Sequence, residues 1–487
     1  MDLDLFVDRG REVAELRRLA GTGRKQLAVL YGRRQVGKTH LLSHAWEPGT
    51  RVFYFLAAAL TPELNRQDLV RELAAWSGRS LAQEDYPTWR AVFRELLSMA
   101  QEGPLVTILD VFQYLLAQGG EVTSQLVAVW DAASRALPLT LVLSGSEVST
   151  MAHLHAGGEP LFGRVTWAAH LSPFDYRDAA RMAPWLELRD AAYLYGVFGG
   201  TPRYLAALEQ GELLADAVAR TFISPHGEVH LQMVTLIEQE KGIRQPAEYR
   251  AVLTAVAGGR TGLNDIVTST RLEEHVVRRA LAILADMGLV RGERNFQAGP
   301  KAAFRYVLAD HAAAFWHRFL VPNRSRVALG DARGFWDTCV ANELDAYMGR
   351  PFEAMVRQAY QRYHEDWGLP PAREWARWEG ADRQRQSLEV DIAGRLEDGR
   401  LLAGEIKWSA SPHGAGLHTG LIAKLARLAA SGQGWARDVD AAALLYVSAA
   451  GFTPELVALA AADPRLVLVT LHELYPDPEG TGQLPSP

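Results

Sequence analysis

The stretch QLAVLYGRRQVGKTHLLS, residues 26–43, decides the fold of the first part of the chain. It begins with the apolar run Gln26–Tyr31, which is typical of a buried strand, and continues into a loop of the pattern G-x-x-x-x-G-K-T. Glycines in such a loop let backbone N–H groups surround phosphate oxygens, and the N-terminus of the following helix adds partial positive charge. The stretch therefore predicts a phosphate-binding loop between a strand and a helix.

We expect this loop to bind ATP together with Mg²⁺. In loops of this kind the lysine, here Lys38, bridges the β- and γ-phosphates, and the hydroxyl of Thr39 is a ligand of Mg²⁺. The residues that we expect to contact the nucleotide are Gly32, Arg33, Arg34, Gln35, Val36, Gly37, Lys38, Thr39 and His40.

A phosphate-binding loop needs a second acid on a neighbouring strand, and Leu105–Asp110 supplies one. We expect Asp110 to hold Mg²⁺ through water. Many hydrolysing relatives place a glutamate next, as the base that polarises the attacking water, whereas Val111 stands here. Because valine accepts no proton, the sequence favours ATP binding with slow or absent hydrolysis. Glu147 is the nearest substitute base, and a solvated loop carboxylate is the alternative interpretation.

Further strand-like runs at 51–56, 105–109 and 139–143 alternate with amphipathic stretches at 61–76 and 86–99. This alternation predicts a parallel sheet that is covered by helices on both faces.

Two more residues of this region are candidates for the nucleotide site. Ser144 follows the strand 139–143, where a polar side chain can sense the γ-phosphate. Arg164 is a candidate charge-stabilising finger, with an ordinary surface arginine as the alternative. If Arg164 acts on another copy of the chain, a homo-oligomer is implied.

Five short motifs give this chain a specific resemblance. They are FVDRGRE at 6–12, DVFQY at 110–114, SGS at 144–146, LFGR at 161–164 and FGGTPRYL at 198–205. Together they resemble the archaeal-type ATPases of the AAA+/STAND class, although Val111 replaces the glutamate of the usual D-E-F-Q-Y. The resemblance implies that the Gly-Gly-x-Pro helix folds back over the nucleotide, which would bring Pro202 and Arg203 close to the adenine or the phosphates.

Many members of that class carry a winged helix and then a domain resembling restriction endonucleases. Residues 246–296 fit the first expectation, with helices predicted at 249–256, 263–268 and 272–287 before a hairpin. We expect this segment to bind DNA, with Arg271, Arg278 and Arg279 as candidate contacts. A spacer that binds another protein is the alternative.

The last third carries the pattern E-V-D-I at 389–392 and G-E-I-K at 404–407. Asp391 and Glu405 lie 14 residues apart across a predicted hairpin, so that they face each other, and Glu405 and Lys407 share a strand face. This arrangement resembles the PD-(D/E)xK nucleases. It predicts a site for Mg²⁺ or Mn²⁺ in which Lys407 orients a water molecule or offsets phosphate charge. Glu353, near the start of a helix, is the candidate further ligand, and Glu389 could be a second acid.

Alternatives exist for these patterns as well. A solvated charged strand would also explain Glu405 and Lys407, but the apolar flanks and the position after a winged helix favour the metal site. The stretch 373–378, which alternates Arg with Trp, fits either a groove for nucleic acid or, with more support from its pattern, a strand with a buried aromatic face.

The predicted organisation is a multidomain α/β protein. Residues 1–172 form a P-loop parallel-sheet ATPase core, 173–240 a helical lid, 241–300 a winged helix-turn-helix, 301–475 a restriction-endonuclease-like α/β domain and 476–487 a disordered tail. The 487 residues carry a net charge of −6, which excludes a polybasic protein, and the single cysteine excludes a disulfide framework or a Cys-based zinc site. An acidic N-terminus and the lack of a long apolar run predict a cytoplasmic protein without a membrane span.

The leading hypothesis is an ATP-binding protein that binds DNA and cleaves it with a divalent metal ion. The alternative is a nucleotide-controlled switch or DNA-binding regulator that catalyses nothing.

Overall fold

The computed structural model describes residues 9–116, 121–238, 243, 245–299 and 301–476. The chain divides into two compact units, Met1–Pro173 and Phe174–Pro487. The predicted disordered tail lies outside the described residues except for Pro476.

The first unit is built on a five-stranded sheet in the order β2-β3-β4-β1-β5, and every strand pair in it is parallel. The strands are β1 (Gln26–Tyr31), β2 (Val52–Leu56), β3 (Leu105–Asp110), β4 (Leu139–Gly145) and β5 (Trp167–His170). The four apolar runs of the sequence are thus confirmed as strands. Strand β5 was not predicted, because it has only four residues and none of them is buried.

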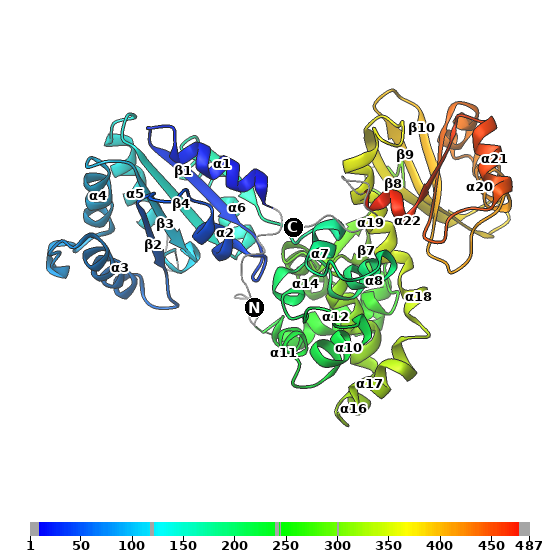
Figure 1. Ribbon diagram of the computed structural model, residues 1–487, viewed down its shortest axis with the longest axis horizontal. Coiled ribbons are helices and arrows are strands. Elements are labelled where there is room, and N and C mark those ends of the chain that lie inside the picture. The colour runs from blue at the N-terminus through cyan, green and yellow to red at the C-terminus, as the bar shows by residue number, and fades with distance from the viewer. Residues whose placement is uncertain (1–8, 117–120, 239–242, 244, 300, 477–487) are drawn as a thin grey trace. The chain divides into compact units, whose positions relative to one another are not determined.

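Helices cover both faces of this sheet, as expected for strands that are almost wholly buried (Figure 1). On one face, α1 (Gly10–Ala20) and α2 (Lys38–His44) pack their apolar side chains on Ala28, Leu30 and Val142. On the other face the apolar side chains of β1 and β4 pack with those of four helices, α3 (Pro62–Ser77), α4 (Trp89–Ala100), α5 (Glu121–Ala132) and α6 (Val148–His153). The sheet is therefore the middle layer of three.

The second unit begins with short helices and continues into three helices and a hairpin. The first group is α7 (Tyr176–Arg181), α8 (Leu188–Phe198), α9 (Pro202–Leu205), α10 (Leu214–Val218) and α11 (Glu228–Thr235). The second is α12 (Pro246–Ala257), α13 (Leu263–Thr270), α14 (Glu274–Asp286) and the antiparallel pair β6 (Val290–Glu293) and β7 (Arg305–Leu308). The three helices predicted for 246–296 are present, and they share one apolar core.

Further short helices lead to the second sheet. They are α15 (His311–Phe315), α16 (Arg324–Val327), α17 (Ala332–Phe335) and α18 (Leu344–Tyr347), and the longer α19 (Gly349–Tyr363) follows. The sheet has the order β12-β11-β10-β9-β8. Its strands and last helices are β8 (Ala372–Ala381), β9 (Ser387–Leu396), β10 (Leu401–Lys407), α20 (Gly416–Ala430), β11 (Ala443–Ser448), α21 (Pro454–Ala462), β12 (Leu466–Thr470) and α22 (Leu471–Leu474).

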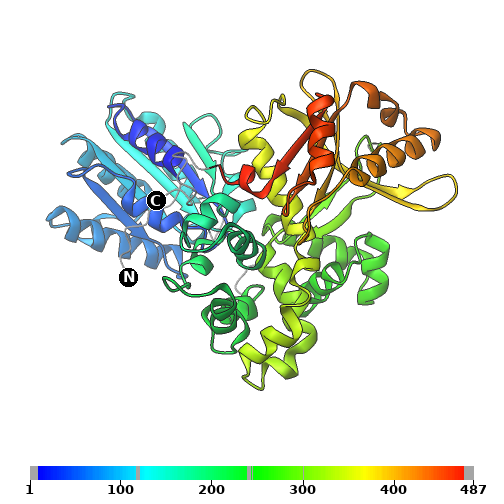
Figure 2. The same cartoon turned by 45° about the vertical axis from the view of Figure 1, so that its right-hand side comes forward.

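This second sheet is mixed: β8, β9 and β10 are antiparallel neighbours, and β10, β11 and β12 are parallel. Gly404 permits the close pairing of β10 with β11, because a Cβ atom at this position would lie 2.0 Å from the carbonyl oxygen of Leu445. Helix α19 packs against β10, and α20 packs against β9 and β10 (Figure 2). Two shifts of register interrupt the pairing of β8 with β9.

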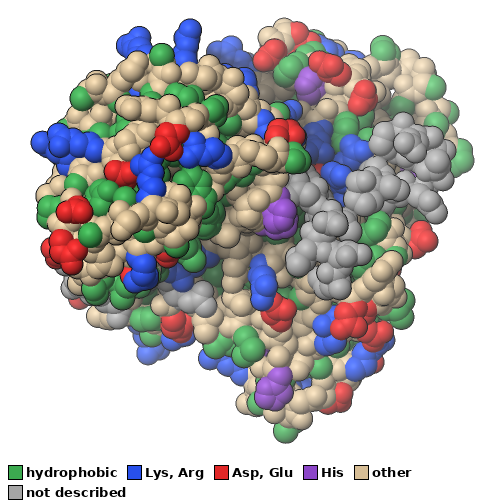
Figure 3. Space-filling view, turned by 60° about the vertical axis from the view of Figure 1, so that its left-hand side comes forward, with side chains coloured by type: hydrophobic (Ala, Val, Ile, Leu, Met, Phe, Trp, Pro, Cys, Tyr) green, Lys and Arg blue, Asp and Glu red, His purple; other side chains and the backbone are tan. Residues whose placement is uncertain are grey.

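Over the described part of the chain, no helix is both long and apolar enough to cross a membrane. Among the described side chains on the face drawn in Figure 3, basic and acidic groups are interspersed and do not form one continuous basic surface.

Candidate functional site

The phosphate loop joins β1 to α2, as the sequence predicted. Its backbone takes left-handed conformations at Gln35, with φ 68°, and at Gly37, with φ 91°, directly before α2 begins at Lys38. Gly32 lies so close to the chain after β5 that an added Cβ atom would be 2.3 Å from the carbonyl oxygen of Leu171. The two glycines of the G-x-x-x-x-G-K-T pattern are therefore both required by the local geometry.

Lys38 lies within this loop. Its Nζ donates hydrogen bonds to the carbonyl oxygens of Gly32, at 2.7 Å, and Arg33, at 2.9 Å. The side chain is buried, and this burial lowers the pKa of Lys38 to about 8, although Asp110 acts in the opposite direction. A phosphate that binds here would pair its negative charge with the buried ammonium group and favour the charged form of Lys38.

Asp110 ends β3 and collects three hydrogen bonds. Its Oδ2 accepts from Thr39 Oγ1, at 2.9 Å, and from the hydroxyl of Tyr54, at 2.5 Å, and its Oδ1 accepts from the Val111 N–H, at 2.8 Å. The predicted pair of Thr39 and Asp110 is thus brought together. Burial, followed by the bond to Asp110, raises the pKa of Tyr54, which keeps this hydroxyl a donor.

Tyr54 was not predicted, because its contact with Asp110 crosses from β2 to the neighbouring strand. The only signal was the position of a polar ring near the end of an apolar strand beside the acid-bearing one.

Val111 has φ 54° and ψ 42°, a left-handed conformation that is unusual for a β-branched residue. Its side chain cannot act as a base. Glu147, the predicted substitute, precedes α6 and accepts a hydrogen bond from Thr150 Oγ1 at 3.3 Å. Ser144 lies in β4 and is fully buried, and its hydroxyl has no hydrogen-bond partner among the described residues.

Arg164 lies at the wrong edge of the sheet for a finger within the same chain. It precedes β5, which runs parallel to β1, so it sits at the amino end of the strands, whereas the phosphate loop follows the carboxyl end of β1. Its guanidinium group forms a bidentate ion pair with Asp131, with contacts of 2.8 and 2.6 Å. This geometry gives no support to action within one chain, and the role of Arg164 as a finger stays a prediction.

Pro202 and Arg203 belong to the second unit. Pro202 begins α9, and Arg203 forms an ion pair of 2.5 Å with Glu228. Their contact with the nucleotide stays a prediction.

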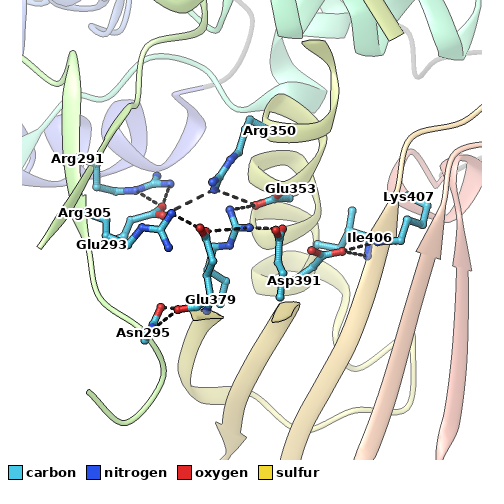
Figure 4. A network of polar contacts seen from close by, with 12 residues as sticks. Arg291, Glu293, Asn295, Arg305, Arg350, Glu353, Glu379, Asp391, Ile406 and Lys407 are labelled. Carbon is cyan, nitrogen blue, oxygen red and sulfur yellow. Dashed lines mark hydrogen bonds and ion pairs between the residues drawn. The ribbon is translucent and has the colours of Figure 1, made fainter. Parts of the chain in front are cut away.

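Three carboxylates gather in the second unit, at one end of the mixed sheet (Figure 4). Oxygen atoms of Glu353, on α19, and of Glu389 and Asp391, on β9, all lie within 4.8 Å of one another. Hard oxygen ligands in this number suit Mg²⁺ or Mn²⁺. The set contains two of the three predicted carboxylate ligands, Asp391 and Glu353, together with Glu389, the candidate second acid.

Glu405 is held differently from the prediction. Its Oε1 lies 2.6 Å from Lys424 Nζ, on α20, and its Oε2 lies 2.5 Å from Lys407 Nζ. The strand register does place Glu405 opposite Asp391, because the neighbouring pair is Gly404 with Ile392. However, Lys407 Nζ also donates to Asp391 Oδ2, at 2.9 Å, so an ammonium group stands between the two acids where a metal ion was expected.

Burial and neighbouring charges act in opposite directions on the pKa values of the acids in this cluster. Burial would raise the pKa of Asp391, but Lys407 and the Ile406 N–H outweigh it and lower this pKa below its ordinary value. Burial likewise raises the pKa of Glu353 to about 7, although Arg350 and Arg377 act against it. At neutral pH and without a bound cation, Glu353 is therefore close to half protonated.

Two residues of this centre were missed by sequence reasoning. Lys424 comes from a helix whose apolar face, with Leu421, Leu425 and Leu428, gave no functional signal. Arg377 was noted only as part of the Arg/Trp stretch, which is strand β8 with Trp378 buried. Arg377 forms ion pairs with Glu389 and with Glu379, the second at 3.5 Å.

Comparison with known protein families agrees with the geometry of the first unit. Residues 6–208 match a family described as an ATPase domain predominantly from Archaea. This match covers less than half of the chain, so it is a similarity of residues 6–208 to that family. Residues 316–416 match a second family, described as archaeal and bacterial proteins of unknown function. That second match ends before β11, so it covers only the first part of the mixed-sheet region.

Individual proteins are similar at lower levels. An uncharacterized protein of Methanocaldococcus jannaschii is 23% identical over 420 residues, which cover 83% of this chain and 88% of that protein. The Walker-type ATPase of Pyrococcus abyssi has a TM-score of 0.49 at 22% identity and covers 64% of this chain and 96% of that one. The Aeropyrum pernix ORC2 protein, in its complexes with ADPNP and ADP, has a TM-score of 0.45 at 17% identity, with coverages of 66% and 96%.

Proposed function

We propose that this protein is a nucleotide-controlled phosphodiesterase that binds DNA and hydrolyses it with a divalent metal ion. ATP with Mg²⁺ would bind in the first unit, where Lys38, Thr39 and Asp110 already stand together. The second unit would bind and cut DNA. The observation that carries the proposal is the convergence of Glu353, Glu389 and Asp391 within 4.8 Å, with Lys407 bonded to Asp391.

The chemistry of these side chains supports hydrolysis of a phosphodiester. A divalent cation bound by the three carboxylates would lower the pKa of a water molecule and offset charge on the phosphate. Lys407 is held in place by Asp391 and Glu405, so its remaining donor capacity can orient the attacking water or contact the phosphate. The water oxygen would bond to phosphorus as one P–O ester bond breaks, and the departing oxygen would take up the proton that the water gives up, which leaves a phosphate monoester and a hydroxyl.

The helices α12, α13 and α14 and the hairpin β6–β7 are proposed as a winged helix that positions duplex DNA. Arg278 and Arg279 are 60% and 54% exposed on α14, and each pairs with a glutamate, Glu274 and Glu248 respectively. Phosphate groups can compete for such exposed arginines at little cost, because surface ion pairs contribute only ~0–1 kcal/mol. A docking surface for another protein is the alternative use of this segment.

One observation favours a second candidate function, a switch that binds ATP without turning it over. The position after Asp110 holds Val111, and Asp110 itself is engaged by Thr39 and Tyr54. In this case ATP would control DNA binding, and no hydrolysis would be needed in either unit.

The deciding experiment is a cleavage assay of the full chain on linear, circular and single-stranded DNA, with and without Mg²⁺ and ATP. Asp391→Asn should abolish cleavage, because it removes one charged ligand while keeping an acceptor for the Ile406 N–H. Glu374→Gln, which changes an exposed acid on the neighbouring strand β8, is the matched control and should cut at the normal rate. No cleavage by the wild type under any of these conditions would favour the non-catalytic switch.

A further inference from the structure

A cavity of about 270 Å³ adjoins the carboxylate centre within the second unit. Its walls come from the hairpin β6–β7, from α15 and α19 and from the strands β8, β9 and β10. Asp391 and Glu353 form part of its lining, so whatever binds in the cavity lies next to the proposed metal ligands. The size is close to the lower end of the ~300–1,000 Å³ that is typical of ligand sites, which suits a small group rather than a helix.

The charge of this lining is positive. Five arginines and three carboxylates face the cavity, so the arginines exceed the acids by two. Some of these arginines are already bound: Arg291 donates to Glu293, at 3.1 Å, and Arg350 lies 3.4 Å from Glu353 (Figure 4). Arg318 lies 3.3 Å from Glu343, so Arg357 and Arg377 are the two arginines left to consider.

Arg357 is one of them. It is partly buried on α19, and none of the described residues forms a hydrogen bond or an ion pair with its guanidinium group. Burial, followed by the nearby charge of Arg291, lowers the pKa of Arg357, although the charges of Glu293 and Glu353 act in the opposite direction. An unpaired guanidinium that lines a cavity is costly in free energy unless an anion accompanies it.

Arg377 is the second. Its side chain is only 11% exposed, and its Nε and Nη1 atoms are buried without any hydrogen-bond partner among the described residues. Only Nη2 is closely engaged, in the ion pair with Glu389. The cavity thus joins two arginines from different elements, each with donors left over, beside a group of metal-binding acids.

We propose that this cavity binds the terminal phosphate of a DNA strand, with Arg357 and Arg377 as its ligands. The inference deepens the proposed function and rests on it for the identity of the ligand, since a strand end in the cavity would place the adjoining phosphodiester beside Asp391. Arginine is well suited to this task, because its planar fork donates two hydrogen bonds to phosphate oxygens.

A strand end fits the site better than the interior of a strand. A terminal phosphate monoester carries about −1.5 to −2 charges at pH 7, whereas an internal diester carries one, so a strand end is the stronger ligand for Arg357 and Arg377. The product of each cleavage would again be a strand with a new end.

The test measures binding and does not depend on cleavage. Pentathymidylate with a 5′-phosphate, with a 3′-phosphate or with neither is titrated into the full chain by calorimetry in EDTA, and inorganic phosphate forms a fourth arm. All proteins carry Lys38→Ala, so that the phosphate loop does not contribute. We expect one phosphorylated oligonucleotide to bind about 10- to 100-fold more tightly than the unphosphorylated one, as for loss of a charged hydrogen bond.

Arg357→Met should remove this preference while keeping the apolar stem, and Arg357→Lys should restore part of it. Arg395→Met is the matched control, since Arg395 lies on β9, pairs with Asp438 and does not line the cavity. The inference is overturned if phosphorylated and unphosphorylated oligonucleotides bind equally, if Arg395→Met loses the preference as well, or if only inorganic phosphate binds.

The two hypotheses fail in different ways. A phosphate preference that depends on Arg357, in a protein that cleaves nothing, would refute the nuclease and support the cavity. Cleavage that depends on Asp391, without any preference for a phosphorylated end, would support the nuclease and refute the cavity.

Discussion

Replacing Lys407 by methionine tests whether the ammonium group of this lysine occupies the place of a cation. Lys407 Nζ lies 2.9 Å from Asp391 Oδ2 and 2.5 Å from Glu405 Oε2, and these two carboxylate side chains are 7% and 2% exposed. In the variant, Asp391 would keep the Ile406 N–H, and Glu405 would keep Lys424. Two buried acids would lose the charge that they share.

The size of the effect follows from these contacts. Removal of one partner from a buried ion pair costs ~3–5 kcal/mol. Here each acid keeps a donor, and Lys407 itself is 33% exposed, so that solvent screens part of its charge. We therefore expect Lys407→Met to lower the free energy of unfolding by ~2–3 kcal/mol in EDTA. Since the two acids raise the pKa of Lys407, its contribution is complete below the ordinary lysine pKa and is lost only as the pH rises through the higher value, so the measurement belongs near pH 7.5.

A divalent cation should reverse the loss. Without the ammonium group, the acids attract a metal ion more strongly, and a ligand that binds only the folded state stabilises it in proportion to the logarithm of its concentration. Urea unfolding in EDTA and in Mn²⁺ should show a larger stabilisation by Mn²⁺ in Lys407→Met than in the wild type, although the variant should not cleave DNA. Arg395→Met serves again as the control. Equal stability of variant and wild type in EDTA, or no response of either to Mn²⁺, would refute the reasoning.

Three further predictions concern single residues. Lys38→Ala should weaken ATP binding about 10- to 100-fold in calorimetry, because a charge-assisted contact is lost. The affinity of the wild type for ATP should fall above pH 8, because Lys38, with a pKa of about 8, loses its proton there. Undiminished binding in the variant would contradict the phosphate-loop assignment. Val111→Glu should raise a slow basal release of phosphate from ATP, whereas a wild type that is already fast and unaffected by this change would point to another base, with Glu147→Ala as the check. In EDTA, the free energy of unfolding of the wild type should fall by up to ~3 kcal/mol between pH 5 and pH 8, because Glu353 keeps its proton to about pH 7 in the folded state but releases it near its ordinary pKa in the unfolded state. Glu353→Gln should flatten this pH dependence of the urea midpoint. An unchanged slope in the variant would rule out Glu353 as its source.

The first unit could be predicted almost completely because most of its strands are recognisable in the sequence. Parallel strands buried on both faces are continuous apolar runs, and β1, β3 and β4 all have this form. Strand β5 could not be found in this way, since its four residues are at most partly buried and hydrogen-bond to β1 at one edge. Likewise, the phosphate-loop motif predicts Lys38 and Thr39, and the apolar run 105–110 predicts Asp110. The hydrogen bond from Tyr54 could not be predicted, because it depends on which strands are neighbours in the sheet.

The carboxylate centre was predictable only in part, for a related reason. The spacing of Asp391 and Glu405 gives the register of the hairpin, and the structure has that register. The partners of these acids come from elsewhere: Glu353 from α19, Lys424 from α20 and Arg377 from β8. The local sequence determines which acids face each other across a hairpin, whereas long-range packing determines which lysine and arginine side chains neutralise them.

The lysine and arginine side chains around the carboxylate centre suggest how binding of the metal ion and binding of the phosphate would depend on each other. Arg377 is bound to Glu389, and Lys407 is bound to Asp391, so in the absence of a cation two acids of the metal-binding set are neutralised by neighbouring side chains. A phosphate in the cavity would draw Arg377 towards itself and release Glu389 for the metal. A metal on Glu389 would in turn release Arg377 for the phosphate. Because such coupling is reciprocal in free energy, Mn²⁺ should tighten binding of a phosphorylated oligonucleotide by the same factor by which that oligonucleotide tightens binding of Mn²⁺.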